Sequence, residues 1–248
     1  MLYTLIRREE TLFKYLINNE RIGKMGLFDK FKKNKESENK ETVETVDTQA
    51  LGWDAITAEF ERVYPGQTNP KHYGTLIKWA LGGKDPLDGI SIYDGGDYWH
   101  FVTYGMTELY EKEGDNDDIS GFGYEMTFKL KKDNYSDEEG ELKCICGILQ
   151  AIARITFNNS EIFQPYEFLY TGQTTGIDAY QKSSITGFIC IPDTSVSTIE
   201  TPNGRVEFLT FIGMTDAELK TLSSQQSVKD IYAKLGSDIT DYNRKSLV

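Results

Sequence analysis

The sequence predicts an α+β fold, a single domain in which a mixed β-sheet is flanked by helices. Segments with helical spacing and segments with strand-like runs follow one another without regular alternation, which points to this class. The chain has 248 residues, of which 39% are hydrophobic and 12% aromatic, so it can bury a core. That length suits one large domain or two small ones, and we find no internal repeat that would divide it.

The first fifty residues are expected to lie outside the domain, as a disordered or poorly ordered N-terminal segment. Residues 30–48 are almost wholly charged and polar, and such a stretch cannot bury enough surface to offset the entropy of ordering. The run Met25-Gly-Leu-Phe-Asp-Lys resembles a natural protein start. One interpretation is therefore that residues 1–24 are not translated naturally. The composition then changes sharply, and the domain is predicted to span residues 51–248.

Amphipathic spacing predicts the helices of this domain. In residues 51–64 apolar side chains recur at helical spacing until Pro65-Gly66, a pair that stops helices. Residues 142–157 keep the spacing over a longer stretch, which favours a helix over a strand and places Cys144 and Cys146 on different faces. The remaining helix signals are a capped start at Thr215, with Glu218 three residues on, and a segment over 228–235 that Gly236 ends.

Strands are predicted where aromatic and β-branched residues cluster or alternate with polar ones. The clearest is 121–131, in which every second residue from Phe122 to Leu130 is apolar, so that these side chains share one face. Thr201–Gly204 is a hairpin-type turn, and the short apolar segment 75–81 ends at a pair of glycines. The other predicted strands are residues 90–93, 98–104, 168–170, 187–191 and 206–212.

The charge balance argues against several classes of protein. Lys plus Arg number 27 and Asp plus Glu number 39, which gives a formal charge of −12. So acidic a surface repels nucleic-acid phosphates and has the wrong sign for a peripheral membrane protein. No run of about 18 apolar residues occurs that could span a bilayer. The first residues have scattered charges and no clean apolar stretch, so we expect no signal peptide. The three cysteines form no C-x-x-C pair, and we expect free, buried thiols in a cytoplasmic protein.

No common catalytic, cofactor or metal motif is present, and we therefore expect a protein that is not an enzyme and needs no cofactor or metal. The acidic run Asp115–Asp118 invites a calcium site, but the glycine and glutamate that an EF-hand loop requires at its sixth and twelfth positions are missing. His100 lies in a predicted strand, where a hydrogen-bonded structural role is the commoner one. An alternative hypothesis is an unrecognised enzyme site built around His100 with Glu108 or Asp97.

A cluster of aromatic residues is the main candidate for a functional surface. In a strand over 98–104 the aromatic side chains cannot all face one way, so some must point away from the main core. They either cover a second layer of structure or form a recognition surface, for which Tyr and Trp are favoured anchors. With the acidic residues that follow, the candidate protein-binding residues are Tyr98, Trp99, Tyr104, Glu108, Tyr110, Asp115, Asp117 and Asp118.

Several ordered strings of this domain resemble the Suppressor of fused domain family. The resemblance covers about residues 51–244, and its strings are long and closely spaced, which makes it specific. They are Val63-Tyr-Pro-Gly-Gln-Thr-Asn-Pro70, Trp79-Ala-Leu-Gly-Gly-Lys-Asp-Pro-Leu-Asp88, Tyr98-Trp-His-Phe-Val-Thr-Tyr-Gly-Met-Thr-Glu-Leu-Tyr110, Ser120-Gly-Phe-Gly-Tyr-Glu-Met-Thr-Phe-Lys-Leu-Lys131, Thr201-Pro-Asn-Gly-Arg-Val-Glu-Phe-Leu209 and Ile239-Thr-Asp241.

The resemblance implies a bacterial, single-domain member that binds another protein. Animal members have a second, C-terminal domain and clamp a short peptide strand between the two; this sequence ends where the first domain ends, so we expect no such clamp. Bacterial single-domain relatives are proposed as immunity proteins beside polymorphic toxins, and a basic toxin domain would suit an acidic surface. A further hypothesis is a regulator that binds a peptide by adding it as a strand to an exposed sheet edge near the aromatic cluster.

Overall fold

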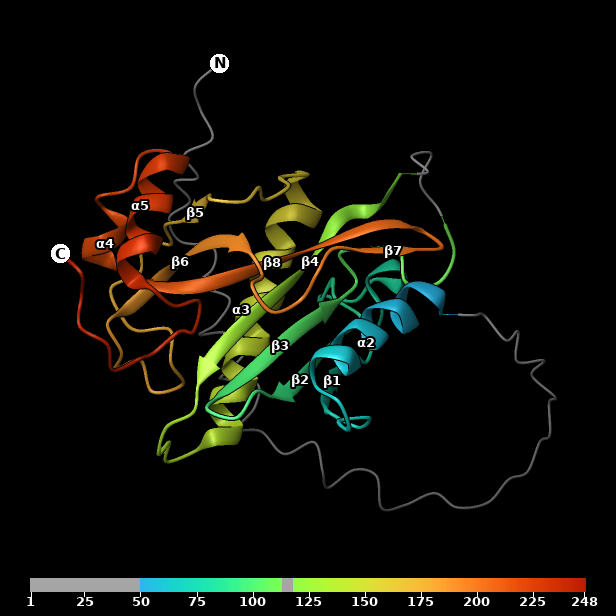
Figure 1. The fold of residues 1–248 in the computed structure, drawn as a ribbon, viewed down its shortest axis with the longest axis horizontal. Coiled ribbons are helices and arrows are strands. Elements are labelled where there is room, and N and C mark those ends of the chain that lie inside the picture. The colour runs from blue at the N-terminus through green and yellow to red at the C-terminus, as the bar shows by residue number, and fades with distance from the viewer. Residues whose placement is uncertain (1–49, 113–117) are drawn as a thin grey trace.

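The fold is one mixed β-sheet with helices on both faces. The structure, a computed structural model, describes residues 50–112 and 118–248 (Figure 1). On one face the long helix α3 (Glu138–Asn159) packs against the sheet, behind it in this view. The other face is covered by α2 (Leu51–Val63) at one end and by α4 (Asp216–Leu219) with α5 (Gln225–Leu235) at the other. This arrangement confirms the predicted α+β class.

The described part of the chain supplies eight strands to the sheet. They are β1 (Lys71–Gly74), β2 (Gly89–Asp94), β3 (Tyr98–Tyr104), β4 (Ile119–Lys131), β5 (Phe168–Leu169), β6 (Ile185–Pro192), β7 (Ile199–Thr201) and β8 (Gly204–Thr215). Their order is β1-β2-β3-β4-β8-β6-β5, and β7 pairs with β8 beside this path. Only the central pair β4 and β8 is parallel among these strands. A parallel pair needs a long crossover connection, and α3 lies in the one that joins β4 to β8.

Most predicted elements are confirmed, with shifted ends. The alternating segment is β4, which begins two residues earlier than predicted, and α3 begins four residues earlier because Asp137 caps it by accepting from the Gly140 amide. Thr215 and Glu218 form the predicted capping box, and Gly236 ends α5 in the left-handed conformation that favours glycine.

Two short strands were missed, and one apolar segment is mostly irregular. β1 and β7 are four and three residues long, and they lack the aromatic and β-branched runs that identify longer strands. Of the apolar segment 75–81, only Trp79–Leu81 forms a single 3-10 turn, η1. The predicted segments N-terminal to residue 50 lie outside the described residues, and the domain division at residue 51 stays a prediction.

The described residues also bear on the membrane and cysteine predictions. Among them no helix is both long and apolar enough to cross a membrane. Cys144, Cys146 and Cys190 are free thiols, as predicted. Cys146 and Cys190 are buried, whereas Cys144 is half-buried and its thiol donates to the Ile177 carbonyl oxygen at 3.1 Å.

The two faces of the sheet differ in how continuous their apolar cover is. The face under α3 is one unbroken cluster, to which β4 contributes alternate residues such as Met126, Phe128 and Leu130. The opposite face has two separate clusters, one under α2 that includes Phe60 and one under α4 and α5 that includes Ile231. Between these two clusters lies a strip of the sheet whose side chains are polar. Because the strip is buried, its polar groups must find hydrogen-bond partners within the protein.

Lys129 and Asp193 form the centre of this polar strip. Both side chains are almost fully buried, and the ammonium lies 3.1 Å from the carboxylate. The same ammonium donates to Asp238 at 2.5 Å and to Ser195 at 2.8 Å. Asp193 in turn accepts from Thr127 of β4 at 2.5 Å. The strip thus ties β4 to the segment after β6 and to the C-terminal segment.

His100 of β3 completes the strip. Its Nε2 lies 3.0 Å from the Asp193 carboxylate and its Nδ1 lies 2.6 Å from the Tyr64 hydroxyl. Burial lowers the pKa of His100, so the ring is neutral, with Nε2–H donating to Asp193 and Nδ1 accepting from Tyr64. Burial opposes ionisation of Asp193, but the hydrogen bond from His100 and the charge of Lys129 outweigh it and hold the pKa of Asp193 below its usual range.

Replacement of Lys129 by Met should cost about 3–5 kcal/mol of unfolding free energy, because it leaves two buried or nearly buried carboxylates without their cation. Lys131→Met is the matched control. That lysine lies two residues on in the same strand and pairs with Asp241, but its side chain is half exposed, so its loss should cost at most about 1 kcal/mol. Urea denaturation of the three proteins measures the difference, and equal losses would contradict the assignment.

Candidate functional site

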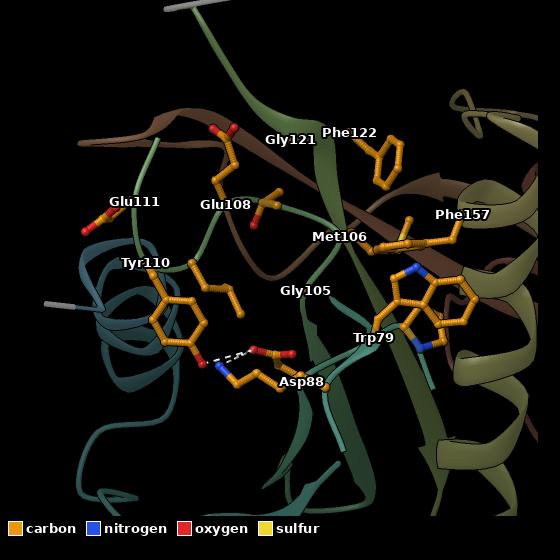
Figure 2. Close-up of a pocket in the computed structure, with 14 residues that line it drawn as sticks. Trp79, Asp88, Gly105, Met106, Glu108, Tyr110, Glu111, Gly121, Phe122 and Phe157 are labelled. Atoms are coloured by element: carbon orange, nitrogen blue, oxygen red, sulfur yellow. Dashed lines mark hydrogen bonds and ion pairs between the residues drawn. The ribbon is translucent and has the colours of Figure 1, made fainter. Parts of the chain in front are cut away.

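An open groove of about 630 Å³ lies beyond the C-terminal end of β3 (Figure 2). Its walls come from residues 78–79, 105–111 and 121–122, together with Pro86, Asp88 and, near the end of α3, Phe157. We call it the aromatic groove. Its volume falls in the range of known ligand sites, and its walls come from segments far apart in the sequence that the sheet and α3 bring together.

One wall of the aromatic groove is a cluster of three half-buried rings. Phe157 packs edge-to-face on Trp79, with ring centroids 5.7 Å apart, and on Phe122, with centroids 5.0 Å apart. Figure 2 shows these rings on one side of the groove and Tyr110 on the other. Half-buried aromatic rings combine large apolar area with few rotatable bonds, which makes them suited to hold an apolar side chain of a partner.

The polar groups of the groove are arranged so that its rim is acidic. Asp88 accepts from the Tyr110 hydroxyl at 2.9 Å and pairs with Lys78 at 3.2 Å, and the Lys78 ammonium lies 3.9 Å from the centre of the Tyr110 ring (Figure 2). The charge of Lys78 is thereby matched by Asp88. Glu111 is exposed, and Glu108 lies 3.4 Å from Lys112, which itself donates to two backbone carbonyls.

A buried carboxylate behind the groove holds its loop in place. Glu125 of β4 accepts from the Gly105, Met106 and Thr107 amides and from the hydroxyls of Thr103 and Thr107, at 2.6 to 3.4 Å. Burial raises the pKa of Glu125 to about 7, against these hydrogen bonds, which favour the ionised form. The shape of the loop that lines the groove therefore depends on one side chain of the sheet.

Glycine is required where this loop meets its neighbours. Gly105 has a φ of 129°, a region that only glycine adopts readily, and a Cβ there would lie 2.9 Å from the Asp88 amide nitrogen. Gly121 has a φ of 51°, and its Cβ would lie 2.8 Å from the Met106 carbonyl oxygen. A side chain at either position would push the groove loop away from β4 or from the segment before β2.

The segment that carries Lys78 and Trp79 of the groove wall also carries three exposed aliphatic side chains, which we call the aliphatic ridge. They are Leu76, Ile77 and Leu81, which lie within six residues of sequence and are 101%, 58% and 77% exposed. The residues that follow this segment are fixed to α3: Gln150 makes two hydrogen bonds with the Leu87 backbone, and Arg154 binds the Lys84 carbonyl and the Asp85 carboxylate. Clustered exposed aliphatic residues on an anchored segment are typical of an interaction surface.

The structure divides the predicted binding residues between several places. Glu108 and Tyr110 line the aromatic groove, and Asp118 is exposed at the start of β4. Tyr98 and Trp99 lie at the opposite end of β3, half-buried, with the Lys132 ammonium 4.0 Å from the Trp99 ring. The last two predicted residues, Asp115 and Asp117, lie outside the described residues.

Tyr104 was predicted to belong to a binding surface, and the structure places it in the interior instead. It is 1% exposed, stacks on Trp53 of α2 with ring centroids 4.1 Å apart, and its hydroxyl lies 3.2 Å from that of Thr57. The aromatic residues of β3 do alternate between the faces, but α2 covers the second face at this end. For Tyr104, therefore, the interpretation as a second structural layer is correct.

The structure removes the geometry on which the alternative enzyme hypothesis rests. His100 is fully buried, and both its ring nitrogens are committed to Tyr64 and Asp193, so no ring nitrogen faces a substrate. Glu108 lies in the aromatic groove beyond the other end of β3, and is not a partner of His100. No group of three or more His, Cys, Asp or Glu in the described ranges is placed to hold a metal ion.

Comparison with known proteins gives consistent matches to one family. A family model described as Suppressor of fused protein (SUFU) matches residues 83–245. The Suppressor of fused homologs of Homo sapiens and Mus musculus are each 31% identical to this chain over an alignment of 191 residues, which covers 71% of this chain and 37% of each relative. The chain therefore spans little more than a third of the length of these curated relatives.

Solved structures with the same fold include animal and bacterial proteins. Drosophila Suppressor of Fused matches with a TM-score of 0.67 and 27% identity, over 79% of this chain and 51% of that one. The crystal structure of a Sufu-Fu complex matches with a TM-score of 0.67 and 24% identity, over 79% and 91%. A putative SUFU homolog from Neisseria gonorrhoeae matches with a TM-score of 0.52 and 14% identity, over 79% and 97%. At these last two identities the likeness concerns the fold alone.

Replacement of Glu125 by Gln should destabilise the protein by about 1–3 kcal/mol, because an amide cannot accept from donors on both sides of the carboxylate. Hydrogen exchange at the amides of Gly105 and Thr107 should speed up more than elsewhere. Glu207→Gln, at a partly exposed position of β8, is the control and should change neither measurement. Unchanged exchange at these two amides would contradict the role given to Glu125.

The raised pKa of Glu125 predicts that the stability difference between the wild type and Glu125→Gln depends on pH. Because the folded-state pKa of Glu125 is raised from 4.5 to about 7, the native state binds a proton between these values that the unfolded state does not. The contribution of Glu125 to stability is fully present below about pH 4.5 and declines as the pH rises through 7. The difference in unfolding free energy between the wild type and Glu125→Gln should therefore be larger at pH 5 than at pH 8. A difference independent of pH would contradict the shift.

Proposed function

This chain belongs to the Suppressor of fused family, and from that premise we propose that it is a non-enzymatic protein-binding module whose binding surface is the aromatic groove together with the aliphatic ridge. The observation that carries the proposal is the grouping of half-buried rings, exposed aliphatic side chains and acidic rim residues on one anchored part of the molecule. An apolar centre with a polar rim is the usual anatomy of a protein interface. One structural relative is a Sufu-Fu complex, an assembly of two proteins.

The partner that this surface fits is a basic protein. Residues 50–248 contain 17 Lys and Arg against 30 Asp and Glu, a formal charge of −13, and Glu108 and Glu111 lie at the groove itself. A field of this sign attracts a basic partner and speeds its association. We propose in particular a basic toxin domain, which the protein would neutralise as an immunity protein in the cytoplasm.

A second candidate is strand addition by a peptide at a sheet edge. In the described residues β1 and β5 are the two outer strands, and neither has a strand partner on its outer side. Lys71 of β1 lies 5.2 Å from the Trp99 ring, so this edge is beside the half of the aromatic cluster that is not in the groove. Protection of the β1 backbone amides on binding, with no effect of groove substitutions, would favour this candidate.

Two substitutions on fully or largely exposed residues test the surface without disturbing the core. Leu76→Asp removes the most exposed residue of the aliphatic ridge, and Glu111→Arg reverses a charge at the groove. Each should weaken binding of the partner about tenfold or more. The effect of Glu111→Arg should lie in the association rate and should shrink at about 0.5 M salt.

The matched controls make the same chemical changes far from the groove. Leu247→Asp changes an exposed leucine of the C-terminal segment, and Asp230→Arg reverses an exposed charge on α5, at the other end of the sheet. The measurement is surface plasmon resonance against purified products of the neighbouring genes. Equal affinities of the groove and control variants for a confirmed partner would overturn the placement of the surface.

The proposed immunity role has its own test. The chain is co-expressed with each basic neighbouring gene product in sensitive bacteria, and colony counts are compared with and without it. We expect rescue by the wild type and by Leu247→Asp. With Leu76→Asp, the number of surviving colonies should fall about tenfold or more below that with the wild type. If no neighbouring product is both toxic and bound by this protein, the immunity role is wrong, whereas the protein-binding surface can still be tested on a non-toxic partner.

A further inference from the structure

The chain enters its folded domain at the wall of the aromatic groove. The amides of Gly52 and Trp53 both donate to the Leu109 carbonyl oxygen, at 3.0 and 3.3 Å. Gly52 lies so close to the groove loop that a Cβ on it would be 2.2 Å from the Glu108 carbonyl oxygen. Any segment that precedes α2 therefore leaves the domain next to residues 108–110, which line the groove.

The sequence before α2 contains one short stretch whose chemistry complements the groove. Residues 24–35 contain five lysines and one aspartate, a formal charge of +4, and three large apolar residues, Leu27, Phe28 and Phe31. We call this stretch the basic aromatic segment. Residues 36–49, which separate it from the domain, have five acidic residues and one lysine, a formal charge of −4. The acidic domain therefore repels the spacer and attracts the segment beyond it.

We propose that the basic aromatic segment occupies the aromatic groove of its own chain. Phe28 and Phe31 are three residues apart, the spacing by which anchor residues of a peptide helix enter an apolar groove. They meet the ring cluster that includes Phe122 and Phe157, while the lysines that flank them meet Glu108 and Glu111 at the rim.

The tether is long enough for this contact and makes it favourable. Fifteen residues, 36–50, separate the segment from α2, and an extended chain spans about 3.3 Å per residue, or roughly 50 Å. The groove lies directly beside the junction, so the spacer reaches it without strain. A binding element joined to its site in one chain acts at an effective concentration of up to about millimolar, so that even a weak contact is well populated.

The consequence is competition within one chain for the surface that we propose for partner binding. A partner with a basic, apolar contact segment must displace the chain's own segment before it can bind. Partners that match the groove poorly are thereby excluded, since they gain too little to replace the internal contact. The internal contact itself does not depend on any partner.

Photo-crosslinking in the full chain tests the contact. A benzophenone amino acid replaces Phe31, and the crosslinked residues are identified by mass spectrometry after irradiation of a dilute mixture of isotope-labelled and unlabelled protein. We expect crosslinks within one molecule, concentrated on residues 78–79, 105–111 and 121–122. Lys30→Glu, Lys32→Glu and Lys33→Glu together should lower the yield about fivefold or more, as should about 1 M salt.

The controls keep the probe and the charge change but move them along the chain. The same amino acid at Phe13 should show no preference for the groove, and Arg7→Glu, Arg8→Glu and Lys14→Glu together should leave the Phe31 crosslinks unchanged. Crosslinks spread over other surfaces, or formed only between labelled and unlabelled molecules, would overturn the proposal. Because no partner is present, this result is independent of the proposed function: groove crosslinks would support the internal contact even if the chain proved to bind no partner there.

Discussion

The fold depends on the buried polar face of its central strand. On one side of β4 the alternate residues are apolar and join the core under α3, but on the other side Glu125, Thr127 and Lys129 are completely buried. Buried polar groups cost free energy unless each has partners. Glu125 finds them in the groove loop, Thr127 in Asp193, and Lys129 in two carboxylates. Three separate regions of the chain are thereby held against a single strand: the groove loop, the segment at Asp193 and the segment at Asp238.

This constraint connects the scaffold to the proposed binding surface. The polar strip at Lys129 separates the apolar clusters under α2 and under α4 with α5, and so positions these helices at opposite ends of one face. Four residues earlier in β4, Glu125 fixes the loop that begins at Gly105 and lines the aromatic groove. The residues that follow the ridge segment are fixed from the other face, through Gln150 and Arg154 of α3. The surface is thus assembled from irregular segments whose positions are set by regular ones, which is common for binding sites.

The sequence predicted the apolar half of this structure better than the polar half. The period-two pattern of β4 and the helical stripe of α3 are repeated local signals, and both elements are where they were expected. The partners of Lys129 are not local: Asp193 and Asp238 lie 64 and 109 residues further along the chain, and no pattern joins them. Tyr104 was placed on a surface because the position of α2 over the second face cannot be read from the strand itself. The ring cluster of the groove was missed for the same reason, since Trp79, Phe122 and Phe157 meet only after folding.

The parallel pairing of β4 with β8 has a consequence for how the protein is made. These two strands form the middle of the sheet, yet 72 residues separate the end of one at Lys131 from the start of the other at Gly204. During synthesis the ribosome releases the meander of β1 to β4 first, and the inner edge of β4 stays without its native neighbour until β8 emerges. Folding of the sheet centre is therefore a late, non-local step of the kind that slows folding. A nascent chain of this topology exposes an unpaired strand edge for the seconds that translation of the crossover takes, and such edges are prone to aggregation.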